Sequence, residues 1–495
     1  MTDKHYAGDA SLIAKRYSSE RRFRAYGAVS LAISVLFLVY LIFDIGTKAW
    51  PSFFEHSVAL DINIDPAKVD AKDIMKGDFD LLLKDNLRGL FPNVTERADK
   101  KKLVSLLSVG AADDLRIQTV ANPGSIGSTV RANALLADDA DLYYKGMLFK
   151  TVKIPGKADL QLAQSGEGYL LTGDLSQLAM GQILRANGGA LRITGVEAGV
   201  AKAEALMVPS TLDALKAGSY DMLSIATPEA DRRIDDKTVV WLETLADKGA
   251  VENHVAWRFF TSGDSREPEL AGLRGAIVGS LLTLIMTLSL SVPLGVAAAV
   301  YLEEFAAKNR WTDLIEVNIN NLAAVPSIIF GLLGLAVFIN FLGLPRSAPL
   351  VGGLVLALLV LPTIIIASRA ALKAVPPSIK EAALGVGASH QQAVFQHVLP
   401  LAMPGILTGT ILGVARALGE TAPLLMIGMV AFIVDVPKGF TEAATVLPVQ
   451  IYLWSDLPEI AFQSRTAAAI IVLLVILFCL NAIAIYFRKR FEQRW

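Results

Sequence analysis

Long runs of apolar residues alternate with charged segments along this chain, and these runs predict helices that cross a membrane. The predicted helices cover residues 26–49, 275–302, 319–342, 349–370, 404–434 and 466–487. An α-helix rises about 1.5 Å per residue, so about 20 apolar residues cross a hydrocarbon layer about 30 Å thick. The pattern therefore predicts a polytopic α-helical membrane protein with six transmembrane helices.

Residues 50–270, between the first two predicted helices, follow a different pattern. Apolar and polar residues alternate over 58–64 and 190–196, as in strands, whereas 74–87 and 100–109 have helical spacing. The segment is long enough for one or two packed lobes. We therefore expect an α+β domain here, called the insert below, and its sequence does not indicate its role.

The composition agrees with a membrane protein and excludes several classes of function. Of the 495 residues, 53% are hydrophobic, which is too apolar for a soluble enzyme of this length. The net charge of −1 gives no electrostatic basis for binding nucleic acid. Cys479 is the only cysteine, so the insert has no disulfide. No Walker A pattern, catalytic triad or metal-ligand spacing occurs, so we expect no enzyme, metal site or ATP site here.

Basic residues predict the orientation. Residues 1–25 form a tail whose Lys and Arg precede the first run, which places the N-terminus in the cytoplasm. No small-residue cleavage site follows this run, so we interpret it as a retained anchor rather than a signal peptide. Six spans then return the C-terminus to the cytoplasm and place the insert outside. The later basic residues that agree with this orientation are Lys308, Arg310, Arg369, Lys373, Lys380, Arg488, Lys489, Arg490 and Arg494.

Arg416 and Glu420 are charged residues inside the predicted helix 404–434. At about 1.5 Å per residue, Arg416 lies about 18 Å beyond Pro404, near the middle of a membrane, where one charge costs roughly 2.5–3.5 kcal/mol. Their spacing places both side chains on one helix face. Two interpretations are open: a buried pair that only fixes helix packing, or a guanidinium that binds a passing anion, with Glu420 as its counter-ion.

The segment 376–400, after the fourth predicted helix, has the pattern of two short capped helices. Ser378 precedes Glu381 by three residues and Ser389 precedes Gln392 by three, which is the capping-box spacing. Two glycines separate these signals, and Leu399-Pro400 is expected to end the second helix. Such a helix pair could dock into a groove on a soluble partner. It could equally be a re-entrant linker in which Glu381 is only a cap.

The same segment resembles the EAA loop of bacterial ABC importer permeases. His397 stands where that pattern usually has an aliphatic residue, which is a modest departure. Longer strings over 279–305, 325–334 and 415–425 (the last reading ARALGETAPLL) are similar to the PstA family of phosphate permeases. The resemblance covers about 255 to 490 and is weak over the insert. The residues that match the EAA pattern are Glu381, Ala382, Ala383, Gly387, Leu399 and Pro400.

The resemblance implies a type I ABC importer permease domain over 271–490 and a phosphate importer in the bacterial inner membrane. It implies that the EAA loop docks on a cytoplasmic ATPase dimer (PstB-like), which uses the ATP and Mg²⁺. The other implied partners are a second permease (PstC-like), a periplasmic phosphate-binding protein (PstS-like) and membrane lipid. The residues expected to line the substrate pathway are Arg416, Glu420 and Thr421.

Three other functions compete with this one. The cargo could be another oxyanion, such as molybdate or sulfate. The chain could be a membrane-anchored sensor, although a sensor needs only one or two spans and a cytoplasmic signalling domain. A proton-coupled carrier is a further alternative, and it would need no docking loop.

Overall fold

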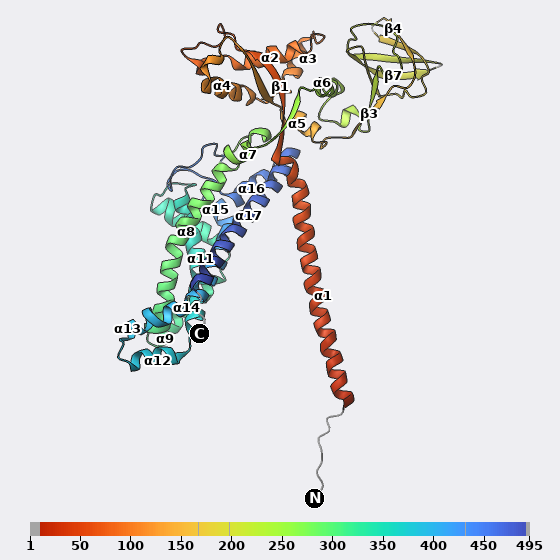
Figure 1. Cartoon of the computed structure of the whole chain (residues 1–495). Helices are drawn as coiled ribbons and strands as arrows, with labels where there is room; N and C mark the ends of the chain where they lie inside the picture. Colours follow the sequence, from red (N-terminus) through yellow and green to blue (C-terminus); the bar gives the residue numbers. More distant parts are fainter. Residues whose placement is uncertain (1–9, 167, 198, 431, 492–495) are drawn as a thin grey trace. The chain divides into compact units, whose positions relative to one another are not determined.

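The computed structural model describes residues 10–491 apart from 167, 198 and 431, and the chain divides into two compact units (Figure 1). The membrane unit comprises residues 1–51, 276–431 and 436–495. The insert unit comprises residues 52–275 and 432–435. Residues 1–9 of the predicted tail and Arg494 lie outside the described residues.

The membrane unit is helical, and its long helices confirm the predicted fold class. Five helices among the described residues are long and apolar enough to cross a membrane, or six if one bent pair is a single span. Three segments are π-helical turns: η6 (Tyr301–Phe305), η7 (Gly334–Phe341) and η8 (Ala393–Val398). The α-helices are α1 (Ala10–Ala49), α8 (Arg274–Val300), α9 (Arg310–Ala323), α10 (Ser327–Leu333), α11 (Pro349–Lys373), α12 (Pro377–Gly385), α13 (His390–Gln392), α14 (Leu399–Gly419), α15 (Ala422–Met426), α16 (Leu447–Ser455) and α17 (Ile460–Phe491).

Two of the predicted transmembrane helices are wrong, because neither segment forms one continuous helix. In place of 319–342, α9 and the α10–η7 segment meet at an angle of 103°. Pro326 explains this bend, because a proline restricts the preceding residue and cannot donate a backbone hydrogen bond. In place of 404–434, α14 ends at Gly419 and only the short α15 follows.

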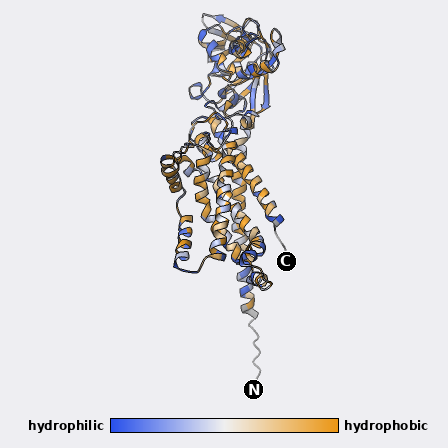
Figure 2. Ribbon diagram, turned by 90° about the vertical axis from the view of Figure 1, so that its left-hand side faces the viewer, coloured by the Kyte–Doolittle hydropathy of each residue, from blue (hydrophilic) through white to orange (hydrophobic). Residues whose placement is uncertain are grey.

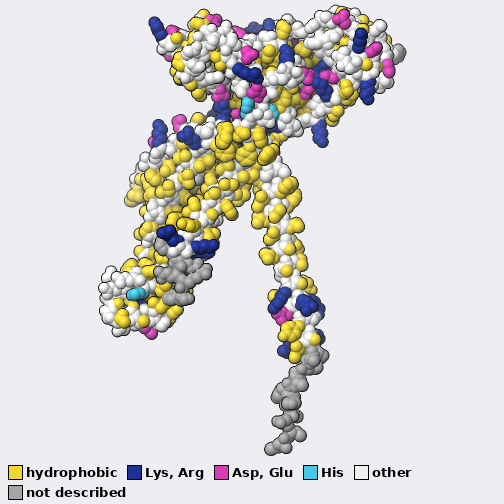
Figure 3. Space-filling view, in the orientation of Figure 1, with side chains coloured by type: hydrophobic (Ala, Val, Ile, Leu, Met, Phe, Trp, Pro, Cys, Tyr) yellow, Lys and Arg dark blue, Asp and Glu magenta, His cyan; other side chains and the backbone are white. Residues whose placement is uncertain are grey.

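The core of the membrane unit surrounds α11. Val355, Leu356 and Val360 of α11 are buried among side chains of α8, η7 and α15. The helices of this unit are mostly apolar along their length, as Figure 2 shows. In contrast, no part of the most apolar stretch of α1 is buried. Figure 3 shows this helix covered with apolar side chains, with Lys and Arg near its N-terminal end, so α1 presents a surface suited to lipid or to another apolar helix.

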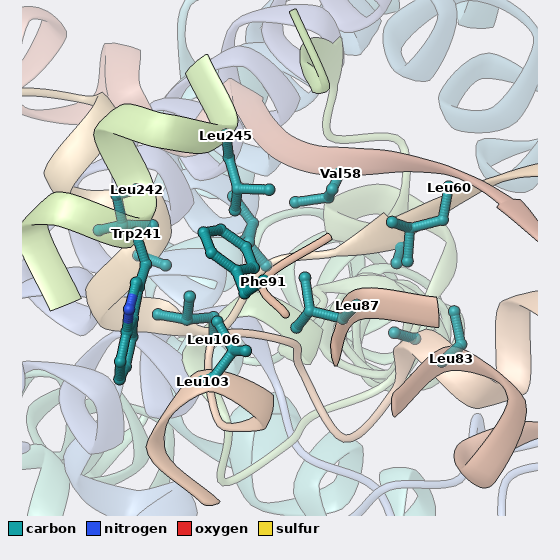
Figure 4. Close-up of a cluster of buried hydrophobic side chains, with 14 of the residues drawn as sticks. Val58, Leu60, Leu83, Leu87, Phe91, Leu103, Leu106, Trp241, Leu242 and Leu245 are labelled. Carbon is teal, nitrogen blue, oxygen red and sulfur yellow. The ribbon is translucent and has the colours of Figure 1, made fainter. Parts of the chain in front are cut away.

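The first lobe of the insert unit is a three-stranded antiparallel sheet with helices packed on it. The strand order is β10 (Val251–Val255), β1 (Phe54–Asn63) and β2 (Thr129–Leu135), with Val58 opposite both Val251 and Ala134. Trp241 and Leu245 of α6 and Leu87 of α2 belong to one core, with Phe91 between Trp241 and Leu87 (Figure 4). The helices are α2 (Phe79–Gly89), α3 (Arg97–Val104), α4 (Ala111–Ala121), α5 (Asp138–Tyr144), α6 (Asp236–Asp247) and α7 (Arg258–Thr261).

The second lobe is a seven-stranded antiparallel sheet that curls round on itself. Leu160, at the start of β4, forms a bridge with Leu215, just before β9. Its interior holds a separate apolar core that includes Leu171, Leu191 and Met222. The strand order is β3 (Thr151–Pro155), β9 (Asp221–Ile225), β6 (Ile183–Ala186), β7 (Gly189–Glu197), β8 (Val200–Met207), β5 (Gly168–Gly173) and β4 (Leu160–Ser165).

Among the local predictions for the insert, the two strands are confirmed and the two helices have wrong bounds. The predicted strands 58–64 and 190–196 fall on β1 and β7. The helical pattern over 74–87 is interrupted at Gly77, and α2 starts after Asp78, whose side chain accepts a hydrogen bond from the Leu81 N–H. The pattern over 100–109 ends early, because α3 stops at Val104.

Candidate functional site

The predicted pathway residues lie where α14 ends. Glu420 is the C-cap of α14, with extended backbone angles of φ −78° and ψ 123°. The prediction that Arg416 and Glu420 share one helix face is therefore wrong, because Glu420 lies outside α14. The predicted depth of Arg416 in the membrane stays a prediction. The turn of the backbone still brings the pair together, because Arg416 Nε lies 3.5 Å from Glu420 Oε1. Thr421 follows as the N-cap of α15.

This ion pair is loose and partly accessible. The Arg416 side chain is 37% exposed and the Glu420 side chain 21%. Their separation exceeds the roughly 2.7–2.9 Å of a strong charge-assisted hydrogen bond. Within this chain, the Arg416 side chain is therefore partly uncovered and is not held in a tight ion pair.

A row of glycines holds α14 against α11 just before this site. A Cβ atom added at Gly405 or Gly409 would lie 2.5 or 2.2 Å from the Cβ of Ala371 or Ala367, respectively. One added at Gly413 would lie 2.7 Å from a methyl group of Val360. The sequence analysis missed this contact, although glycines at every fourth position are a known signal of close helix packing in membranes. Since Arg416 follows Gly413 by about one turn, the contact fixes where the backbone of Arg416 lies.

The segment predicted to dock on a partner forms α12 and α13 at one end of the membrane unit (Figure 1). The capping box at Ser389 is confirmed, since its Oγ accepts from the Gln392 N–H and the Gln392 Oε1 accepts from the Ser389 N–H. The capping box predicted at Ser378 is wrong. The N-cap of α12 is Pro376 and makes no side-chain bond, because two consecutive prolines start this helix.

The remaining residues of this segment divide between surface and interior. Glu381 and Ala382 are exposed, whereas Ala383 is buried. Gly387 has φ +93°, a conformation that favours glycine, and it turns the chain from α12 towards α13. The exposed side of α12 therefore presents a carboxylate beside a small residue.

Leu399 and Pro400 do not end the second helix, contrary to the prediction. The helix continues from His390 to Gly419, and the π turn η8 precedes Pro400. The wider π turn accommodates a proline, which lacks an N–H and would disturb a regular helix at this point. His397 is exposed, so its departure from the EAA pattern disturbs no packing.

A group of charged side chains that the sequence analysis did not single out lies where α8 ends. Glu303 and Glu304 of η6 contact Arg369 of α11 and Lys380 of α12. Two consecutive carboxylates directly after an uncharged span were the available signal.

Two cavities lie away from the Arg416 pair. An apolar cavity of about 500 Å³ in the membrane unit is lined by residues of α8, η6, η8 and α14, such as Tyr301 and Met403. A polar cavity of about 330 Å³ in the insert includes Arg192 and Glu229, which pair with each other. Among the described residues, no three His, Cys, Asp or Glu side chains come together as metal ligands would.

Comparisons with known proteins match two parts of the chain. Residues 291–494 match the family of binding-protein-dependent transport system inner membrane components. Residues 10–153 match a domain of unknown function, DUF3333. Residues 154–290, which include most of the curled sheet, lie between the two matched ranges.

Several known proteins are similar to about half of the chain or less. The phosphate transport system permease protein PstA 1 of Mycobacterium tuberculosis is 31% identical over 250 residues, which is 50% of this chain and 81% of that protein. PstA of Mycobacterium leprae is 32% identical over 255 residues, with 50% and 82% covered. The probable ABC transporter permease protein YqgI of Bacillus subtilis is 34% identical over 174 residues, which is 35% of this chain and 58% of that relative.

Proposed function

The chain belongs to the PstA family of phosphate transport system permeases, and from this premise we propose that it imports inorganic phosphate across the bacterial inner membrane. It forms the pathway together with a second, PstC-like permease. A PstS-like binding protein delivers the anion, and a PstB-like ATPase dimer hydrolyses ATP with Mg²⁺. We therefore assign ATP hydrolysis to that ATPase rather than to this chain.

The loose pair Arg416–Glu420 is the observation that carries the proposal. A guanidinium presents a planar fork of N–H donors that matches two phosphate oxygens. The pair lies at the break between α14 and α15, where the backbone of residues 420–421 is not helical. Within a membrane, non-helical backbone is tolerated where it is buried in protein or lines a hydrated cavity. The break therefore favours a site inside the pathway, with Thr421 beside it, over one that faces lipid.

Glu420 supplies a reason for choosing phosphate over other oxyanions. Phosphate near neutral pH keeps a P–OH group that can donate a hydrogen bond to a carboxylate. Sulfate and molybdate have no such proton, so their oxygens and the Glu420 carboxylate repel each other. The same carboxylate competes for Arg416, which keeps binding weak enough for release.

The exposed face of α12 is the proposed docking surface for the ATPase. Glu381 and Ala382 lie at the contact, while Ala383, Leu399 and Pro400 hold this face on the membrane unit. Gly387 lets the chain turn so that α12 and α13 form one short lever. Both termini and this surface then lie in the cytoplasm and the insert lies outside, as the basic loops predict.

Uptake of labelled anions by the complete importer in proteoliposomes tests the function. We expect ATP-dependent phosphate uptake that excess sulfate or molybdate does not inhibit. Arg416→Ala should lower it roughly a hundredfold, because two hydrogen bonds to a charged donor contribute ~3 kcal/mol and each 1.4 kcal/mol is tenfold. The complex should still assemble, and the exposed Arg346→Ala should transport normally. Unimpaired transport by Arg416→Ala rejects the pathway role, and uptake of sulfate or molybdate in preference to phosphate rejects the cargo.

A further inference from the structure

The π-helical turn η6 (Tyr301–Phe305) joins the end of α8 to three other helices. The Ala306 N–H donates to the Tyr301 carbonyl at 2.8 Å, which closes the wide turn. π turns inside longer helices occur frequently at functional positions. This one places two adjacent carboxylates, Glu303 and Glu304, on different neighbours.

Glu304 contacts both short helices of the docking segment. Its side chain is only 9% exposed, and its Oε2 lies 2.6 Å from Nζ of Lys380 on α12. Its backbone carbonyl accepts a hydrogen bond from Nε2 of His390, the first residue of α13, at 2.8 Å. The ring of Phe305 meets the His390 ring edge-on, with centroids 5.0 Å apart. One residue and its neighbour therefore hold α12 and α13 together.

Glu303 anchors the same turn to the long helices. Its Oε2 lies 3.4 Å from Nε of Arg369 on α11, and Arg369 also pairs with Glu316 of α9. A separate apolar cluster joins Val300 and Leu302 to Leu372 of α11 and to Val394 and Val398 of η8. The end of α8 is therefore held both by ion pairs and by packed apolar side chains.

We propose that Glu304 is a positioning residue that makes α8, α12 and α13 move as one rigid body. The inference rests on the proposed function, because only there does α12 receive movement from an ATPase. Transmission needs a rigid element whose position differs between two states. α8 is the first apolar helix of the permease domain. Through Glu304, a displacement of α12 therefore reaches α8 and the pathway directly, and it does not have to pass along the chain from α12 to α14.

The two partners should respond unequally to substitution. Lys380 is 30% exposed, so after Glu304→Gln its ammonium can turn towards water. After Lys380→Met, the Glu304 carboxylate stays buried without its cation, and an unpaired buried charge is the more unfavourable outcome. We therefore expect Lys380→Met to loosen α12 more than Glu304→Gln does.

Distances between a spin label on α8 and one at the C-cap of α12 test the rigid link directly. Leu294 and Val386 are 59% and 87% exposed, so Leu294→Cys and Val386→Cys give labelling sites in a Cys479→Ser background. The labelled full chain in lipid nanodiscs should give a narrow distance distribution. Glu304→Gln should broaden it and Lys380→Met should broaden it further. The charge exchange Glu304→Lys with Lys380→Glu should narrow it again.

Lys373→Met is the matched control, because Lys373 is 57% exposed and lies 3.5 Å from Glu303 rather than contacting Glu304. It should leave the distribution narrow, as should Glu381→Lys, which changes only the docking face. Unchanged widths in both Glu304→Gln and Lys380→Met overturn the proposal. Broadening by Lys373→Met to the same extent also overturns it, since the effect is then one of general charge loss.

The complete importer gives the second readout, the number of phosphate ions imported per ATP hydrolysed. We expect Glu304→Gln and Lys380→Met to keep ATP hydrolysis near the unmodified rate and to lower this ratio about tenfold, within the range of coupling energies between sites. A merely structural role would lower both rates together. If the unmodified importer moves no phosphate at all, the proposed function fails, whereas the label distances still decide on the rigid link.

Discussion

The membrane unit and the insert unit pack by opposite means. In the membrane unit, α14 approaches α11 through Gly405, Gly409 and Gly413, where even one added carbon atom would overlap a neighbour. In the insert, the core is filled by large side chains, with Trp241 1% exposed and Phe79 fully buried. Figure 4 shows Trp241, Phe91 and several leucines facing one another across this core.

The difference follows from the solvent that each unit excludes. In water, burying apolar surface contributes about 25 cal/mol per Å², so large side chains stabilise the insert. Lipid chains are as apolar as leucine, so burial contributes little between membrane helices, and close backbone approach takes its place. The two units should therefore respond to opposite changes in side-chain size.

The largest effect is expected from removing bulk in the insert. Trp241→Ala should lower the free energy of unfolding of the insert by ~3–5 kcal/mol, the usual loss for a buried aromatic residue. Because each unit has its own core, hydrogen exchange should rise in α2, α6 and β1 and stay unchanged in α11 and α14. Hydrogen exchange measured by mass spectrometry on the full chain follows the elements of both units in one experiment.

Two companion variants sharpen this test. Trp257→Ala removes an exposed ring and should change little. Trp241→Phe should retain most of the stability, since the Trp241 Nε1 makes no hydrogen bond to any described residue. Faster exchange in α11 after Trp241→Ala would show that the two cores are not independent.

Adding bulk to the membrane unit should have the next largest effect. Gly409→Ala places a Cβ atom 2.2 Å from that of Ala367, and overpacking a tight contact typically costs about 1–3 kcal/mol. We expect faster exchange in α11 and α14, lower phosphate uptake and no change in the insert. The double variant Gly409→Ala with Ala367→Gly lacks the opposing carbon atom, so it should restore both the slow exchange in α11 and α14 and the phosphate uptake. Failure of this double variant to recover would mean that Gly409 acts by something other than close contact.

These contrasts also explain which features the sequence predicted. The uncharged runs located α8, α11 and α17 because crossing a membrane demands an apolar composition whatever the packing. Composition could not locate the end of α14 at Gly419, since the residues on both sides are similarly apolar apart from Arg416 and Glu420. The sequence pattern also could not predict the contacts of Glu304, because its partners Lys380 and His390 follow it by more than 70 residues.

The last effect appears only at high pH and concerns a buried carboxyl group in the insert. Burial, and then the neighbouring Asp139, raise the pKa of Asp138 from 3.8 to about 7, although Arg233 favours its ionised form. Between those two pH values the folded protein binds a proton that the unfolded chain has lost. The free energy of unfolding therefore falls as pH rises from about 4 to 7, and above pH 7 the ionised group destabilises the insert fully.

Asp138→Asn removes this pH dependence while keeping the size of the side chain. A pKa raised from 3.8 to about 7 corresponds to roughly 4 kcal/mol above pH 7. We therefore expect the insert of this variant to unfold several degrees higher than the unmodified one at pH 8, since about 1 kcal/mol shifts the midpoint by roughly 2–4 °C in a domain of this size. The difference should shrink towards pH 5, and the exposed Asp231→Asn should show no such trend. Thermal unfolding of the full chain at both pH values measures it. If Asp138→Asn instead lowers the midpoint at pH 8, the attraction to Arg233 at 3.7 Å outweighs the burial of the charge, and the insert core tolerates an ionised carboxylate better than its apolar packing suggests.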